Sequence, residues 1–155
     1  MDERLKILFL CTGNSCRSQM AEGFARQYRG HDIEAYSAGV APSILDPDTI
    51  VIMREAGVDI SDQRSKHVSE LMDIDFDYVV TLCDSARQSC PLFPGKAKVV
   101  HIGFEDPSFR GDGLGEKEQR DKYREVRDEI KEMVLAIPRV LEEHEKGLIL
   151  DVEQT

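Results

Sequence analysis

The sequence contains no apolar run that approaches the roughly 20 residues of a membrane-spanning helix. The apolar run nearest the amino terminus, residues 5–10, is short and follows Asp2, Glu3 and Arg4, which is not the layout of a secretory signal peptide. We therefore expect a cytoplasmic protein without a membrane partner. A length of 155 residues suits one core, so we expect a single domain over residues 1–146 and a flexible tail over residues 147–155.

Basic residues are scarce relative to acidic ones. The chain has 20 Lys and Arg against 30 Asp and Glu, a formal net charge of -10. Nucleic-acid binding depends on Lys and Arg that neutralise phosphates, so we expect no nucleic-acid partner. The overall charge would also repel an anionic substrate. Any site for an oxyanion therefore requires a local cluster of hydrogen-bond donors.

Cysteine is also scarce, and the spacing of the four cysteines excludes two common roles. Structural disulfides are rare in a reducing compartment. Cys11 and Cys16 are separated by four residues and Cys83 and Cys90 by six, and no pair of histidines stands at zinc-site spacing. We expect no metal site and no cofactor. Catalytic or redox thiols remain.

The pattern of apolar residues predicts an α/β fold. Short β-rich runs predict strands at residues 6–10, 33–37, 78–82 and 98–102. Helical spacing of apolar residues predicts helices at 18–28, 49–56, 69–72 and 116–136, and a shorter one after Pro138 up to 145. Strands that alternate with helices indicate a parallel sheet covered on both faces. We expect a three-layer α/β/α fold with a central four-stranded parallel sheet.

Local signals place several helix ends. Asp46 and Pro47 supply an N-cap and a proline at the first helical position, and Gly57 follows that helix. Pro138 lacks the amide donor that a continuing helix needs, so it should break the long helix. Residues 103–115 are rich in Gly, Asp, Pro and Ser and predict a loop.

The most informative segment follows the first predicted strand. It reads Cys11-Thr12-Gly13-Asn14-Ser15-Cys16-Arg17-Ser18. Amides of residues 12–17 and the start of the next helix can point at one anion, and Arg17 offers a planar fork of donors. Gly13, with Asn14 as a second candidate, can accept the positive φ that such a ring of amides demands. The same donors favour the nucleophilic thiolate of Cys11. Alternatively, Cys11 is a buried core cysteine beside a surface arginine.

Two further sites depend on position in the predicted fold. Asp106, in the loop after the fourth strand, can reach the anion pocket and protonate a leaving oxygen; alternatively it is a turn former before Pro107, and Glu105 is its competitor. Cys83 follows the third strand and shares its edge with Cys11. A disulfide to Cys90 across a helix would span about 10.5 Å, more than the roughly 7 Å that a disulfide allows. The segment between them must then be looped or must unwind, or the two cysteines are unrelated.

The loop at residues 11–18 closely resembles the signature loop of low-molecular-weight protein tyrosine phosphatases, and Asp106-Pro107 resembles their general-acid loop. Cys83 with Cys90-Pro91 looks like the thioredoxin-coupled arsenate reductases of the same fold. The resemblance covers residues 6–136. It implies arsenate as substrate, thioredoxin as electron donor and a monomer. The residues expected to bind the oxyanion are Thr12, Gly13, Asn14, Ser15, Cys16 and Arg17.

The resemblance also implies a mechanism. Cys11 attacks arsenic, Asp106 protonates the leaving hydroxide, and Ser18 donates a hydrogen bond to the Cys11 sulfur. Cys83 then attacks Cys11 and releases arsenite. Cys90 attacks Cys83, which leaves a Cys83–Cys90 disulfide for thioredoxin to reduce. The extra thiols are chemically required, because reduction of arsenate takes two electrons that hydrolysis does not provide.

Some details of the resemblance bear on individual residues. Cys16 matches a family cysteine that turnover does not need, so it is structural or an oxidation liability. Some relatives hold potassium beside the loop through residues matching Asn14, Glu22, Ser37 and an acidic residue. Here the last position is Lys66, a cation that would repel potassium and take its place.

Two other functions share these residues. A phosphatase acting on phosphotyrosine or small phosphate esters needs only the loop and the acid. Tyrosine phosphatases of this fold usually carry an aromatic pair soon after the Asp-Pro, whereas Ser108-Phe109-Arg110 offers one aromatic ring. A non-enzymatic oxyanion sensor would signal through Cys83 and Cys90. Turnover separates the sensor from the enzymes.

Overall fold

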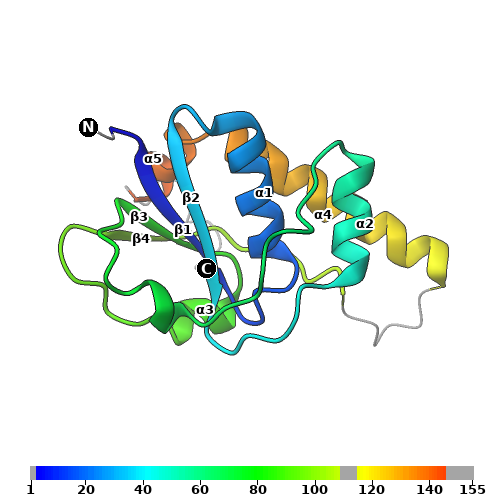
Figure 1. Cartoon of the computed structure of the whole chain (residues 1–155), viewed down its shortest axis with the longest axis horizontal. Coiled ribbons are helices and arrows are strands. Elements are labelled where there is room, and N and C mark those ends of the chain that lie inside the picture. The colour runs from blue at the N-terminus through cyan, green and yellow to red at the C-terminus, as the bar shows by residue number, and fades with distance from the viewer. Residues whose placement is uncertain (1–2, 109–114, 146–155) are drawn as a thin grey trace.

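A computed structural model describes residues 3–108 and 115–145. Its centre is a four-stranded parallel sheet in the order β2-β1-β3-β4 (Figure 1). The strands are β1 (Leu5–Cys11), β2 (Ile33–Gly39), β3 (Tyr78–Thr81) and β4 (Lys98–His101). Each covers or closely matches an apolar run that predicted it. The expected α/β fold with a four-stranded parallel sheet is confirmed.

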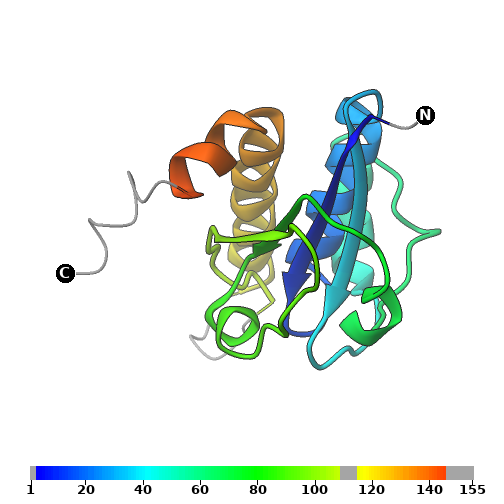
Figure 2. The same ribbon diagram turned by 90° about the vertical axis from the view of Figure 1, so that its left-hand side faces the viewer.

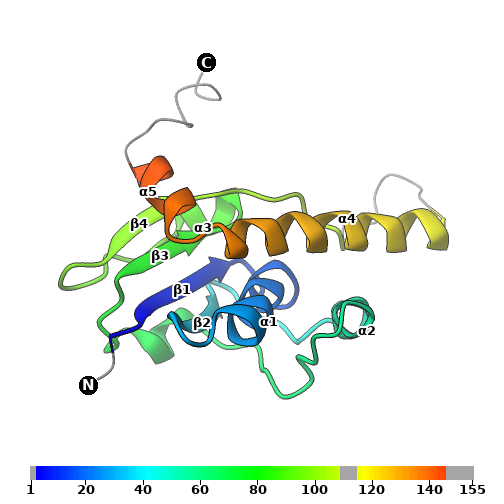
Figure 3. The same ribbon diagram turned by 90° about the horizontal axis from the view of Figure 1, so that it is seen from above.

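Helices cover both faces of the sheet because successive apolar side chains of β1 point to opposite faces, so both faces must be buried. Ile7 and Phe9 pack into the larger core, with residues of α1 (Arg17–Arg29), α2 (Pro47–Glu55), α4 (Glu116–Leu135) and α5 (Arg139–Glu145). Leu8 and Leu10 point to the other face, where η1 (Val68–Leu71) and α3 (Asp84–Gln88) contribute a smaller core. Figure 3 shows α1 and α4 side by side along the first face.

The helix ends agree with the local signals in the sequence. The Asp46 carboxylate accepts a hydrogen bond from the Asp48 amide at 3.1 Å and caps α2. Gly57, which follows the end of α2, has a φ of +83°. Pro138, which follows a cis peptide bond, separates α4 from α5. The short helix expected at 69–72 is a 3₁₀ turn, η1, one residue earlier. The expected tail, residues 147–155, lies outside the described residues.

The carboxyl ends of β1 and β3 meet at one edge of the sheet. Leu10 pairs with Thr81, and the Leu82 amide donates to the Leu10 carbonyl at 2.9 Å. Cys11 and Cys83 therefore leave the sheet at neighbouring positions. In Figure 1, α3 lies at this same end of the sheet, beyond β1.

The opposite end of the molecule is held by Arg29, the last residue of α1. Its Nη1 donates to the carbonyls of Val134 at 3.0 Å and Ile137 at 2.8 Å, where α4 ends. Carbonyls at the end of a helix have few backbone donors available, so Arg29 adds a side-chain donor to them from α1. Figure 2 shows α5 beside this end of α4. Among the described residues, no helix combines the length and apolar character that crossing a bilayer requires.

Gly23 in α1 permits close packing of that helix against the segment after α2. A Cβ at this position would lie 2.6 Å from Ile60 Cγ2 and 3.3 Å from Met53 Cε. We predict that Gly23→Ala lowers the free energy of unfolding by about 1–2 kcal/mol, because overpacking outweighs the gain in helix propensity. Urea denaturation measures it. Gln27→Ala, on the exposed side of α1, is the control and should change stability by about 0.5 kcal/mol or less. A Gly23→Ala protein as stable as the wild type would contradict the packing argument.

Candidate active site

The loop after β1 encloses a small pocket with a thiol at its base. Cys11 is 3% exposed, and its Sγ lies 2.9 Å from Ser18 Oγ at the start of α1. The pocket has a volume of about 290 Å³. Its lining comprises Cys11, Thr12, Gly13, Ser15, Cys16, Arg17, Asp106 and Ser108. The structure thus brings the predicted nucleophile, the loop, the arginine and the acid together around one cavity.

Hydrogen-bond donors at this pocket are free to take an anion. Cys16 occupies the N-cap of α1 and makes no side-chain cap hydrogen bond, so the first amides of α1 are not capped by it. Arg17 Nη1 donates to the Phe104 carbonyl at 2.8 Å, which fixes the guanidinium. Arg17 Nε is buried and has no hydrogen-bond partner in the described part of the chain. A buried, unpaired donor is costly, and a bound oxyanion would satisfy it.

The turn of the loop falls at Asn14 and not at Gly13. Asn14 has φ +50°, whereas Gly13 does not have a positive φ. The expectation was therefore right for Asn14 and wrong for Gly13. Asparagine tolerates this conformation better than most residues, and its side chain is held by hydrogen bonds on two sides. Gly13 serves close approach, because a Cβ there would lie 3.1 Å from Ser43 Oγ.

Asn14 connects the loop to its surroundings. Its Oδ1 accepts from the Lys66 amide at 2.9 Å, and its Nδ2 donates to Ser18 Oγ at 2.8 Å and to Ser37 Oγ at 3.0 Å. Lys66 Nζ donates to the Ser37 carbonyl at 2.9 Å. The pKa of Lys66 is lowered by burial, and the charge of Glu22 opposes this shift. An ammonium group thus lies beside the residues that match a potassium site in some relatives. The absence of potassium stays a prediction.

Cys16 does not have the environment of a nucleophile. It is buried, and desolvation raises the pKa of its thiol well above the usual range, although a hydrogen bond with Thr49 opposes the shift. A neutral thiol is a poor nucleophile. Its contacts fit the structural alternative among the two roles that we considered.

Asp106 faces the pocket and also forms the turn. Its Oδ1 accepts from the Ser108 amide at 2.9 Å and from Ser108 Oγ at 2.6 Å. Its Oδ2 lies 3.8 Å from Arg17 Nη2. The neighbouring Glu105 contacts Lys122 instead and is not part of the pocket lining. The position of Asp106 therefore suits an acid better than that of Glu105.

The second thiol lies next to the loop and the third lies further along. Cys83 Sγ is 3.2 Å from Thr12 Oγ1, and α3 begins immediately after it. Cys90 is half-buried against the smaller core, where burial raises the pKa of its thiol. All four cysteines are free. The five residues of α3, Asp84–Gln88, lie between Cys83 and Cys90 in the sequence.

Residues on α4 brace the site from behind, and sequence reasoning did not identify them. Gln119 donates to the Pro107 carbonyl, next to Asp106. Tyr123 Oη donates to Asp46 Oδ2 at 2.6 Å, and the Asp46 amide donates to the Ser15 carbonyl at 3.0 Å. Their helical spacing indicated only a buried face. These contacts join segments far apart in the sequence, so no local signal reports them.

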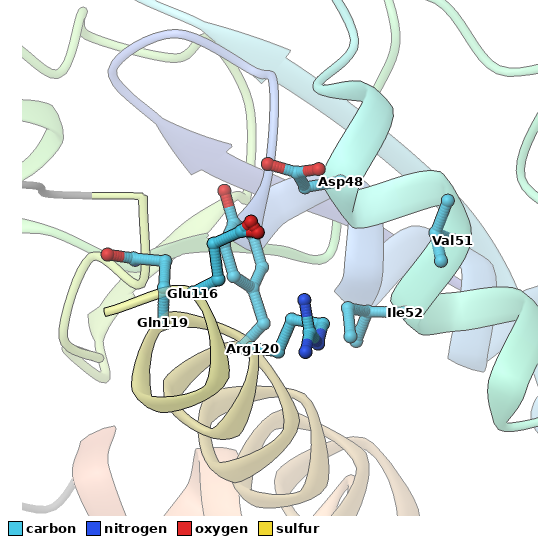
Figure 4. A pocket seen from close by; sticks show the side chains of 7 residues that line it. Asp48, Val51, Ile52, Glu116, Gln119 and Arg120 are labelled. Carbon is cyan, nitrogen blue, oxygen red and sulfur yellow. The ribbon is translucent and has the colours of Figure 1, made fainter. Parts of the chain in front are cut away.

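Gln119 and Tyr123 also line a separate cavity of about 330 Å³ between α2 and α4. Figure 4 shows Asp48 and Glu116 pointing toward each other across it, and Arg120 directed at Ile52. This cavity contains no thiol. The pocket at Cys11, in contrast, is lined by two thiols, an arginine and a carboxylate.

His101, at the end of β4, contacts β3 and the first residue of α3. Its Nδ1 lies 2.8 Å from Thr81 Oγ1, and its Nε2 lies 3.5 Å from Asp84 Oδ1. Burial lowers the pKa of His101. The ring packs at the end of β4, in agreement with an ordinary packing role.

Known proteins resemble this chain in sequence. The family described as low molecular weight phosphotyrosine protein phosphatase matches residues 6–146. The arsenate reductase of Bacillus subtilis (strain 168) is 48% identical over 124 residues, which cover 80% of this chain and 88% of that protein.

Solved structures of related proteins have the same fold. An arsenate reductase in the phosphate-binding state has a TM-score of 0.66 at 34% identity, over 84% of this chain and 93% of that one. A thioredoxin-dependent arsenate reductase of Corynebacterium glutamicum has a TM-score of 0.61 at 29% identity, over 85% and 61%. A low molecular weight protein tyrosine phosphatase from T. tengcongensis has a TM-score of 0.63 at 28% identity, over 86% and 99%.

Gly39 leaves room for the loop. A Cβ on it would lie 2.5 Å from the Thr12 carbonyl oxygen and 3.0 Å from the Asn14 amide nitrogen. We predict that Gly39→Ala weakens binding of inorganic phosphate by about 10- to 100-fold, because displaced donors no longer converge on the anion. Isothermal titration calorimetry measures it. Gly30→Ala, at the exposed end of α1, is the control and should bind phosphate like the wild type. Unchanged affinity in Gly39→Ala, with an intact thermal transition, would show that the loop tolerates the shift.

Proposed function

This chain belongs to the low molecular weight phosphotyrosine protein phosphatase family, and from that membership we propose that it reduces arsenate to arsenite with electrons from its own thiols. One observation carries the proposal: Cys83 Sγ lies 3.2 Å from Thr12 Oγ1, in the loop that surrounds Cys11. A phosphatase needs only the first thiol. A reductase needs a second within reach of it, because two electrons must be supplied.

The first step joins arsenate to Cys11. The loop amides and Arg17, whose Nε is buried without a partner among the described residues, hold the oxyanion. Ser18 Oγ, 2.9 Å from the sulfur, donates to it and favours the thiolate. The thiolate attacks arsenic and forms an S–As bond. Asp106 gives a proton to the departing hydroxide, which leaves as water.

The second step is the reduction. The Cys83 thiolate attacks Cys11 Sγ and forms an S–S bond. The S–As bond breaks, and its electron pair goes to arsenic, which falls from arsenic(V) to arsenic(III) and leaves as arsenite. The hydrogen bond between Thr12 and Cys83 favours this step, since a hydroxyl that donates to sulfur stabilises a thiolate.

The third step moves the disulfide out of the pocket. Cys90 loses its proton to solvent, and its thiolate attacks Cys83 Sγ. The Cys83–Cys90 bond forms, the Cys11–Cys83 bond breaks, and Cys11 leaves as a thiolate. A disulfide needs Cα atoms within about 7 Å, and α3 lies between the two cysteines, so we propose that α3 unwinds as the bond forms. It has only five residues, and such a short helix is only marginally stable by itself. Unwinding is therefore inexpensive.

We further propose that thioredoxin reduces the Cys83–Cys90 disulfide. The support is twofold. A structural relative from Corynebacterium glutamicum is described as thioredoxin-dependent. Cys83 and Cys90 are both only partly buried, so a partner's thiolate has access to the bond between them.

Phosphatase activity is the second candidate. The pocket, Arg17 and Asp106 suffice to form and release a phosphoenzyme on Cys11. The aromatic-pair argument against it concerns Phe109 and Arg110, which lie outside the described residues. Redox turnover with arsenate distinguishes the two activities, and it also excludes a sensor that does not turn over.

The decisive experiment is anaerobic NADPH consumption with arsenate, thioredoxin and thioredoxin reductase. We predict turnover by the wild type and none above background by Cys83→Ser or Cys90→Ser, because the relay has lost a thiol. Any phosphatase activity with p-nitrophenyl phosphate should persist in both variants, since it uses Cys11. Ser89→Ala, an exposed polar residue next to Cys90, is the control and should retain turnover. Normal turnover by Cys90→Ser would refute the three-thiol relay.

Asp106 supplies the proton for the first step. We predict that Asp106→Ala slows that step by about 10²- to 10⁴-fold, the usual cost of lost acid catalysis. Rapid-quench measurement of arsenite release in a single turnover reports the rate. Glu105→Ala, which removes a carboxylate next to it that contacts Lys122, is the control and should be close to the wild type. Wild-type rates in Asp106→Ala would assign the proton to another group.

A further inference from the structure

A chain of hydrogen bonds links the buried thiol to the protein surface. Cys11 Sγ lies 2.9 Å from Ser18 Oγ, which accepts from Asn14 Nδ2 at 2.8 Å. Asn14 Nδ2 also donates to Ser37 Oγ at 3.0 Å, and Ser37 Oγ donates to Glu22 Oε1 at 2.5 Å. The contacts between nitrogen and oxygen atoms and between two oxygen atoms are within ordinary hydrogen-bond distance. The chain therefore ends on a carboxylate that is 3% exposed.

The far end of the chain is a charge pair. Glu22 Oε2, the oxygen that Ser37 does not use, lies 2.6 Å from Arg26 Nη2. Glu22 and Arg26 stand four residues apart on α1. The side chain of Arg26 is 59% exposed, while that of Glu22 is 4% exposed. A buried carboxylate without a partner is strongly unfavourable, so Arg26 compensates it from the surface.

Two groups fix the directions of these hydrogen bonds: the Glu22 carboxylate at Ser37 and the Lys66 backbone amide at Asn14. An ionised carboxylate can only accept hydrogen bonds, so the Ser37 hydroxyl donates its proton to Glu22. Ser37 Oγ then accepts from Asn14 Nδ2. The backbone amide of Lys66 donates to Asn14 Oδ1 and so prevents the side-chain amide of Asn14 from flipping. Ser18 Oγ accepts from Asn14, so its own proton is left for the Cys11 sulfur.

We propose that Arg26 is a positioning residue which, through Glu22, fixes the direction of this chain and so points the Ser18 hydroxyl proton at Cys11. The inference rests on the proposed role of Cys11 as the nucleophile. Without Arg26, the Glu22 carboxylate loses the contact that holds its Oε1 toward the Ser37 hydroxyl. Ser37 would then turn its own proton toward Asn14, where two donors would oppose each other.

Lys66 does not replace Arg26 in this role. Its Nζ donates to the carbonyls of Ser37 and Arg64, at 2.9 and 3.0 Å, and not to the Glu22 carboxylate. Its pKa is lowered by burial, whereas an arginine stays charged at every accessible pH. Charged and titratable groups near the two ends of the chain are Arg26 and Lys66 at Glu22, and Arg17, Cys16 and Asp106 at Cys11.

The pH dependence of Cys11 alkylation by iodoacetamide tests the proposal in the full chain. Only the thiolate reacts, and tandem mass spectrometry of the peptide separates Cys11 from Cys16. We predict that Arg26→Met lowers the Cys11 rate near neutral pH by about 3- to 10-fold, the effect of one weakened charge-assisted hydrogen bond, and raises the midpoint of the pH–rate profile. Arg26→Lys should restore most of the rate.

Two controls separate this role from general destabilisation. Arg139→Met removes a comparable surface arginine, one paired with Glu143 at 3.3 Å on α5, and should leave the Cys11 profile unchanged. In a Glu22→Gln background, Arg26→Met should have no further effect, because its influence passes through Glu22. If Glu22→Gln does not fold, the comparison of Arg26→Met, Arg26→Lys and Arg139→Met decides alone.

A Cys11 pH–rate profile in Arg26→Met equal to that of the wild type would overturn the proposal. It would also be overturned if Arg26→Met lowered the Cys11 alkylation rate as much in the Glu22→Gln background as in the wild type. Alkylation needs neither arsenate nor thioredoxin. If the wild-type protein does not turn over arsenate but Arg26→Met still shifts the pH–rate profile of Cys11 alkylation, the proposed function is refuted and this inference stands. If the wild-type protein turns over arsenate but Arg26→Met leaves the Cys11 profile unchanged, this inference is refuted and the proposed function stands.

Discussion

The site depends on one constraint: a buried thiol becomes a useful nucleophile only when the donors around it have fixed directions. Cys11 sits on the end of β1, and Ser18 on the first turn of α1 reaches back to it. Asn14 bends the loop with a positive φ and orients Ser18 at the same time. Because one residue performs both tasks, the shape of the loop and the direction of its hydrogen bonds are linked.

Charge in this protein is local. The chain has a net charge of -10, yet the pocket at Cys11 is lined by Arg17 and by the start of a helix whose amides carry partial positive charge. Negative charge elsewhere on the surface is screened over roughly 10 Å at moderate salt. The overall charge therefore limits non-specific partners without preventing an oxyanion from binding at the loop.

The segment from Cys83 to Cys90 combines two opposing demands. It holds Cys83 against Thr12, and in the proposed relay it then releases Cys83 to Cys90. A helix of five residues at the end of β3 suits this, because its stability comes mainly from its packing against the smaller core and not from its own hydrogen bonds. Cys83 packs against both cores, whereas Cys90 packs against the smaller one.

The sequence by itself determined the parallel sheet, the order of helices and strands, and the position of the loop, because these depend on local periodicity, caps and breakers such as Asp46, Gly57 and Pro138. It also brought Cys11 and Cys83 to one edge, since parallel strands end together. It did not show that Gly13 avoids a positive φ. Nor did it reveal that Thr12 contacts Cys83, that Gln119 and Tyr123 brace the loops, or that Arg26 pairs with a buried Glu22. Only the tertiary structure decided these contacts, because hydrogen-bond partners across a fold are chosen by packing, and packing leaves no pattern in neighbouring residues.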